Sequence, residues 1–126
     1  MLRSYLPFQF NKGGIFYADF PFEEKISESK LRTVLVWQMH PKMNEVLVSK
    51  LTGVIRGLQW EVPLYPGAHS GIKKQCVARV DQTRYLPISA FCIPVLGTLN
   101  PFEIATVELR FKEYQKERTQ SIVLRR

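Results

Sequence analysis

Short runs of apolar residues alternate with polar ones through the first two-thirds of the chain, and glycine, proline and asparagine separate the runs. Runs rich in β-branched and aromatic residues between such turn residues are typical of β-strands. Five runs fit this pattern, and we expect strands over residues 15–20, 33–38, 45–51, 59–65 and 75–83. The turn over residues 40–44 predicts that the second and third strands form a hairpin.

Residues 21–31 interrupt this pattern with a dense series of charged and polar side chains. A stretch with so few apolar positions has little to bury, so we expect an exposed loop there. Arg32 follows this loop at the start of the second strand, and Thr52 ends the third. If the two strands form a hairpin, Arg32 and Thr52 lie close together at one end of it.

The pattern changes after residue 99 to one that predicts a helix. Asn100 is a suitable cap, Pro101 suits the first helical position, and Glu103 completes a capping box. Apolar residues then recur at helical spacing and form one stripe, which is more typical of core packing than of a ligand platform. The stripe consists of Ile104, Val107, Phe111 and Tyr114. Residues 116–126 fit either an extension of this helix or a basic tail.

These elements predict a mainly β fold with a C-terminal helix (α+β). We expect a small, strongly bent sheet or an SH3-like, partly open barrel that the helix covers. A chain of 126 residues that is 45% hydrophobic suits one domain spanning residues 1–126, and it carries no internal repeat. It has no apolar run long enough to span a membrane, so we expect a cytoplasmic protein without a membrane partner.

Composition narrows the choice of partner. The chain has 18 Lys and Arg against 11 Asp and Glu, a formal charge of +7, which favours nucleic acid first, then an acidic protein or membrane surface. A basic surface without a binding role is the alternative. The two cysteines, Cys76 and Cys92, lie in apolar surroundings without metal-ligand spacing, so we expect buried free thiols; a disulfide or a ligand role is the alternative. We expect no metal and no cofactor.

Four polar residues stand inside or at the end of predicted strands: Arg32, Thr52, Arg79 and Asp81. An unpaired buried charge is strongly destabilising, so core strands have no structural need for such residues. We therefore expect the four side chains to converge on a site. The structural alternatives are a salt bridge between Arg79 and Asp81 on one strand face, and an ordinary strand end at Thr52.

The same segments resemble the MazF/PemK family of toxins over most of residues 13–116. The strand that begins Arg32-Thr33-Val34 is similar to the family's Arg-Pro-Val strand, and the valine-rich strand that ends at Thr52 has the family's form. The segment 77–84, Val-Ala-Arg-Val-Asp-Gln-Thr-Arg, is similar almost position by position to a PemK motif. Two positions depart from the pattern: Thr33 replaces a proline, and residues 21–31 lack the histidine of the PemK branch.

The resemblance implies a small dimeric barrel that cuts single-stranded RNA and that a paired antitoxin silences. It assigns catalytic roles to Arg32, Thr52, Arg79 and Asp81. Such cleavage needs a base for the 2′-hydroxyl, for which Asp81 is the candidate, and cationic donors for the phosphorane, for which the two arginines are suited. Three further residues are candidates for substrate binding: Ser49, Gln82 and His69.

The sequence therefore predicts a sequence-selective, metal-independent endoribonuclease, the toxin of a toxin-antitoxin pair. The alternative is a non-catalytic module on the same fold, either a nucleic-acid binder or a topoisomerase inhibitor of the CcdB type. A basic structural protein without a substrate is a third possibility, which only the net positive charge supports.

Overall fold

The computed structural model describes residues 10–21, 29–40, 42 and 44–124. It contains six strands that form one antiparallel sheet in the order β4-β5-β3-β2-β1-β6, followed by one long helix, α2. The bounds are β1 Gly14–Pro21, β2 Ser29–His40, β3 Glu45–Thr52, β4 Glu61–Leu64, β5 Cys76–Pro87, β6 Phe91–Thr98 and α2 Pro101–Leu124. A single 3₁₀ turn, η1, spans Ile88–Ala90 between β5 and β6.

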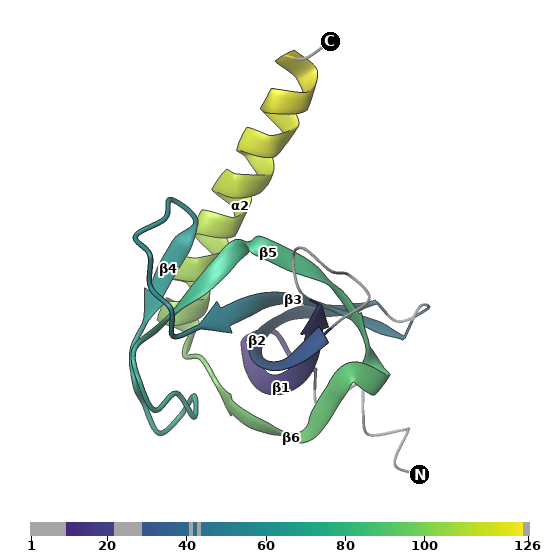
Figure 1. Ribbon diagram of the computed structural model, residues 1–126, viewed down its shortest axis with the longest axis vertical. Helices are drawn as coiled ribbons and strands as arrows, with labels where there is room; N and C mark the ends of the chain where they lie inside the picture. Colours follow the sequence, from purple (N-terminus) through teal and green to yellow (C-terminus); the bar gives the residue numbers. More distant parts are fainter. Residues whose placement is uncertain (1–9, 22–28, 41, 43, 125–126) are drawn as a thin grey trace.

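The sheet is curled, with β5 bending over one side of the central strands and β6 lying along the opposite side (Figure 1). Its two edge strands, β4 and β6, do not pair with each other, so the sheet stays open. The predicted class, mainly β with a C-terminal helix, is confirmed. Among the described residues, no helix has the length and apolar character needed to cross a membrane.

Apolar side chains gather on both faces of the sheet. Val107 of α2 is fully buried against one face, where Trp37 and Phe111 stack with their ring centroids 5.2 Å apart. We call this cluster the helix-side core. The other face carries a second core, which contains Phe16, Val34, Val36, Val46 and Val48. The predicted helical stripe is confirmed, because all four of its residues belong to the helix-side core.

The start of α2 has the predicted capping box. The Asn100 side chain accepts a hydrogen bond from the Glu103 backbone N–H at 2.8 Å, and the Glu103 carboxylate accepts one from the Asn100 N–H at 3.0 Å. These two bonds satisfy donors that a helix start otherwise leaves without partners. Helix α2 continues to Leu124, so residues 116–124 extend the helix, and residues 125–126 lie outside the described residues.

Two expectations about the strands were wrong. Pro21 pairs with Ser29, so the outer parts of the predicted loop 21–31 belong to β1 and β2; residues 22–28 lie outside the described residues. Strand β6 was missed because a proline within an apolar run argues against a strand. The structure resolves this conflict by pairing β6 with β1 only at its two ends, so Pro94 needs no ladder hydrogen bond to β1.

Candidate active site

The β2–β3 hairpin brings two of the predicted catalytic residues together. Thr33 pairs with Leu51, so the next positions along the two strands, Arg32 and Thr52, oppose each other at the end of the ladder. Arg32 alternates in phase with Val34, which places it on the face of the second core. Thr52 has the same relation to the buried valines of β3. The polar pair therefore continues the apolar rows of β2 and β3 to the end of this face.

Strand β5 adds Arg79 to this face. Arg79 is the Cα partner of Lys50 in β3, and Lys50 is in turn the partner of Val34 in β2. Since Lys50 precedes Thr52 by two residues, both side chains belong to the same face. Lys50 was missed in the sequence, although its two-residue spacing from Thr52 within one strand was a usable signal.

Arg79 and Asp81 form a bidentate ion pair. The Arg79 Nε donates to one Asp81 carboxylate oxygen at 2.9 Å, and Nη2 donates to the other at 2.7 Å. The side chains are only 11% and 23% exposed. Two parallel charge-assisted bonds fix both groups in one plane. The salt bridge expected as a structural alternative is thus present. It lies beside the Arg32–Thr52 pair, because Arg79 pairs with Lys50 of β3, two residues before Thr52.

Ser49 belongs to a buried network. Its side chain is fully buried, and its hydroxyl accepts a hydrogen bond from the Trp37 indole N–H at 2.7 Å. The Ser49 and Thr83 hydroxyl oxygens are 2.5 Å apart, and Thr83 donates to the Val80 carbonyl at 2.7 Å. Because the Thr83 proton is used there, Ser49 donates to Thr83. The substrate contact expected of Ser49 stays a prediction, and this arrangement gives its hydroxyl two protein partners instead.

The other two candidate substrate residues lie in different surroundings. Gln82 is half-buried on β5, directly after Asp81. His69 lies against the start of α2, where its Nε2 is 2.8 Å from Glu103, and its backbone carbonyl accepts a hydrogen bond from Thr98 of β6. The hydrogen-bond partners of His69 that the structure shows therefore lie in α2 and β6.

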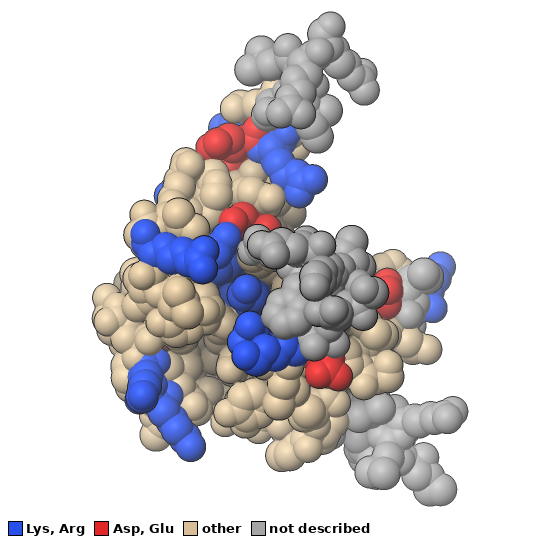
Figure 2. Space-filling view, in the orientation of Figure 1, with Lys and Arg blue, Asp and Glu red and all other residues tan. Residues whose placement is uncertain are grey.

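Glu61 organises the loop that follows Thr52. Its carboxylate accepts hydrogen bonds from the backbone N–H of Arg56 at 3.2 Å and of Gly57 at 2.9 Å. Glu61 is also the Cα partner of Arg79 across the β4–β5 ladder. The loop is thereby held next to the strand that carries Arg79 and Asp81. Figure 2 shows Lys and Arg side chains spread over one face of the molecule, with fewer acidic ones between them.

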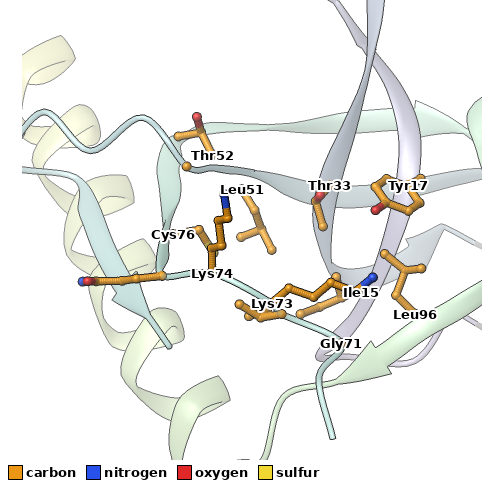
Figure 3. A pocket seen from close by; sticks show the side chains of 13 residues that line it. Ile15, Tyr17, Thr33, Leu51, Thr52, Gly71, Lys73, Lys74, Cys76 and Leu96 are labelled. Carbon is orange, nitrogen blue, oxygen red and sulfur yellow. The ribbon is translucent and has the colours of Figure 1, made fainter. Parts of the chain in front are cut away.

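A pocket of about 280 Å³ opens beside Thr52, on the helix side of the sheet. Tyr17, Thr33 and Leu51 form part of one wall, and Lys73 and Lys74 approach from the segment before β5 (Figure 3). We call it the Tyr17 pocket. Its remaining lining residues are Ile15, Thr52, Gly53, Gly71, Ile72, Gln75, Cys76 and Leu96. The two consecutive lysines were not singled out in the sequence, because only the fold brings them to Thr33.

The cysteines are free, as predicted, but neither is fully buried: Cys76 is half-buried and Cys92 is exposed. Burial raises the pKa of the Cys76 thiol at the Tyr17 pocket. Cys92 is exposed on edge strand β6, so the expectation that it is buried was wrong. A residue in an apolar strand is buried only where other parts of the fold cover the face on which its side chain lies. In the part of the chain that the structure describes, no three His, Cys, Asp or Glu residues group as metal ligands.

Comparisons with known proteins agree on the family. The sequence model of the PemK-like, MazF-like toxins of type II toxin-antitoxin systems matches residues 11–114. The fold is similar to MazF of Deinococcus radiodurans, with a TM-score of 0.67, 16% identity, and coverage of 84% of this chain and 96% of that one. It is also similar to the toxin MazF-mt6 of Mycobacterium tuberculosis, with a TM-score of 0.61, 22% identity, and coverage of 79% and 93%.

A further similar structure is an endoribonuclease from a mycobacterial species in complex with its cognate antitoxin. It has a TM-score of 0.61 and 14% identity, and the match covers 79% of this chain and 88% of that one. At these identities the structural likeness establishes the fold alone. No curated protein sequence matches the chain significantly. The match to the sequence model extends over most of the chain, so the protein belongs to the PemK-like, MazF-like family of toxins of type II toxin-antitoxin systems.

Proposed function

We propose that this protein is a metal-independent, sequence-selective endoribonuclease that cuts single-stranded RNA and acts as the toxin of a toxin-antitoxin pair. One observation carries the proposal: strand register brings Arg32, Thr52 and the Arg79–Asp81 pair to one face of the sheet, in a chain of this toxin family. The residues come from three strands, so convergence is a property of the fold and not of one local motif.

In the proposed reaction, Asp81 takes the proton of the 2′-hydroxyl, and the 2′-oxygen forms a bond to the adjacent phosphorus. The bond from phosphorus to the 5′-oxygen breaks, and that oxygen takes a proton from solvent. The products are a 2′,3′-cyclic phosphate and a 5′-hydroxyl. Arg32 and Arg79 bind the non-bridging phosphate oxygens, where negative charge develops, and the Thr52 hydroxyl donates to the same phosphate.

The ion pair sets a condition on this mechanism. Both Asp81 oxygens accept a hydrogen bond from Arg79, which lowers their basicity although each oxygen keeps a further lone pair. A phosphate bound at Arg79 competes with Asp81 for the same guanidinium and would weaken these bonds. Substrate binding would thus leave an Asp81 carboxylate oxygen more able to take the proton of the 2′-hydroxyl.

The proposed partners follow from charge and family. A formal charge of +7 favours an RNA backbone and also an acidic segment of the antitoxin, which would compete for the same arginines. A similar structure contains a MazE–MazF complex from Deinococcus radiodurans, which supports a cognate antitoxin for this chain. We also propose a homodimer and a cytoplasmic location.

A second candidate function is a non-catalytic nucleic-acid-binding or topoisomerase-inhibiting module on the same fold. The closed Arg79–Asp81 pair favours it, because a purely structural ion pair would have the same geometry. The replacement of the family's proline by Thr33 also favours this second function. Cleavage and binding assays with the same variants decide between the two functions.

The test incubates the protein with a long, mixed-sequence single-stranded RNA in excess EDTA and maps the ends that form. We expect discrete cuts with cyclic-phosphate and 5′-hydroxyl ends, and a rate about 10²–10³ lower for Arg32→Ala or Thr52→Ala. Arg118→Ala, which removes an exposed arginine of α2, is the matched control and should cut normally. A folded wild-type protein that cuts nothing in a diverse RNA pool would instead support the binding module.

Asp81→Asn separates a base from a structural partner. The amide keeps the shape of the carboxylate but cannot take the proton, so we expect cleavage to fall about 10²–10⁴-fold while the variant remains folded. If Asp81→Asn cleaves at the wild-type rate, Asp81 is a structural partner of Arg79 and the base lies elsewhere.

A further inference from the structure

The Tyr17 pocket has a mixed lining that does not fit a plain hydrophobic gap. Its floor is apolar and includes Ile15, Leu51 and Ile72, whereas its rim carries the Tyr17 ring and the Thr33 hydroxyl. Lys73 and Lys74 add two positive charges at one side (Figure 3). Tyr17 is 45% exposed although it lies in a central strand, so its ring offers an accessible aromatic edge or face.

The opposite wall of the pocket is built rigidly. Gly71 has a φ of +78°, and a Cβ there would lie 2.7 Å from the Leu96 carbonyl oxygen. A Cβ on Gly97 would lie 2.3 Å from the Ser70 carbonyl carbon, so the loop packs directly on the β6 backbone. The fully buried Ser70 accepts a hydrogen bond from the Ile72 N–H at 3.2 Å. A wall fixed by such close backbone contacts provides a largely pre-formed cavity.

The location of the pocket links it to the proposed chemistry. Thr52 lines the pocket and also lies opposite Arg32 at the end of the β2–β3 ladder. One residue therefore borders both the pocket and the proposed phosphate site. Thr33 lies between them, as the strand neighbour of Arg32 and the pairing partner of Leu51. A phosphate held by Arg32 and Thr52 would therefore have the pocket next to it, on the other side of strands β2 and β3.

We infer that the Tyr17 pocket binds the base of a nucleotide adjacent to the scissile phosphate and sets the base preference at that position; this inference rests on the proposed function. Single-stranded RNA is recognised by bases that are splayed out, stacked on aromatic side chains and hydrogen-bonded at their edges. Tyr17 supplies the stacking surface, the Thr33 hydroxyl and Gln75 the polar contacts, and Lys74 a cation for the neighbouring phosphate. A volume of about 280 Å³ suits one base better than a longer segment.

The first experiment compares the cleavage rates and cleavage sites of wild type, Tyr17→Ala and Thr33→Val in a randomised single-stranded RNA pool. We expect cleavage to slow at least about fivefold in Tyr17→Ala, because stacking contributes that much per base whichever base is bound. Thr33→Val keeps the shape of the side chain but removes a polar contact, so it should change which base is preferred at one fixed position relative to the cut. Tyr65→Ala, which removes an exposed tyrosine outside the pocket, is the matched control. Unchanged rates and profiles in both pocket variants would overturn the inference while the proposed cleavage stands.

The second experiment does not need cleavage. The four nucleoside 5′-monophosphates and inorganic phosphate are titrated separately into ¹⁵N-labelled wild-type protein, and amide shifts are followed by NMR. We expect shifts centred on Gly53, Gly71 and Ile72 that differ between bases and that inorganic phosphate does not reproduce. Such shifts in a protein that cuts no RNA would support the base site and count against the proposed function. Equal shifts with phosphate alone would show a simple anion site and overturn the inference.

A protein side chain is the competing occupant of the pocket. If Tyr17→Ala and Thr33→Val weaken binding of an acidic antitoxin segment but leave nucleotide shifts and cleavage profiles unchanged, the pocket belongs to the protein partner. That result would also overturn the inference.

Discussion

Replacing Ser49 with alanine should destabilise the protein without affecting its chemistry. Ser49 is fully buried between two partners: it accepts from the Trp37 indole N–H at 2.7 Å and donates to Thr83. The substitution leaves the indole N–H, on a side chain only 6% exposed, without its acceptor. Leaving a buried donor unsatisfied costs about 1–3 kcal/mol. For a chain of this length, that corresponds to a fall in Tm of about 3–6 °C per kcal/mol.

The assay is urea denaturation followed by tryptophan fluorescence and circular dichroism, with the free energy of unfolding obtained by linear extrapolation. Ser89→Ala, which removes an exposed hydroxyl in η1, is the matched control and should change stability by less than about 0.5 kcal/mol. A double-mutant cycle with Trp37→Phe sharpens the test. When the indole N–H is already absent, Ser49→Ala should cost less, because no buried donor loses its partner.

RNA cleavage per folded molecule should be unchanged in Ser49→Ala, since the hydroxyl has no access to solvent. A variant with wild-type stability that cleaves RNA much more slowly would refute this prediction. That result would mean that Ser49 contacts the substrate, as predicted from the sequence, and that the buried network contributes little to the stability of the free protein.

Two further predictions concern titratable groups. Burial raises the pKa of Glu103, but the Asn100 N–H and the His69 ring outweigh this and lower it below its usual value of 4.5. Its charged form therefore stabilises the folded state fully above about pH 4.5, and this contribution is lost as the pH falls through the lower folded value. Glu103→Gln should be less stable at pH 7 by about 0.3–1 kcal/mol, with the difference shrinking in acid. For the thiols, Cys92 is exposed whereas burial raises the pKa of Cys76, so a thiol reagent at pH 8 should modify Cys92 first. Cys92→Ser should remove the fast phase; a fast phase that persists would place the reactive thiol at Cys76.

Local patterns in the sequence determined most of the secondary structure. The capping box at Asn100 and the stripe through Val107 describe contacts within a few residues of each other, and both are present. The hairpin of β2 and β3 follows from alternation and a short turn, and it brought Arg32 and Thr52 together as expected. Register in a hairpin is set by its turn and its buried face, which are both visible in the sequence.

Only the tertiary structure decided the features that depend on distant segments. Ser49 is a polar residue in an apolar run, and its buried role depends on Trp37 and Thr83, which lie in two other strands. Strand β6 contradicts local propensity at Pro94 and exists because the edge of β1 offers it a partner. Lys73 and Lys74 form one side of the Tyr17 pocket only because the glycines at 71 and 97 let that loop pack on β6. Side-chain alternation and helix caps are local and can be read from neighbouring residues, whereas burial, partners and pockets arise from the way distant strands meet.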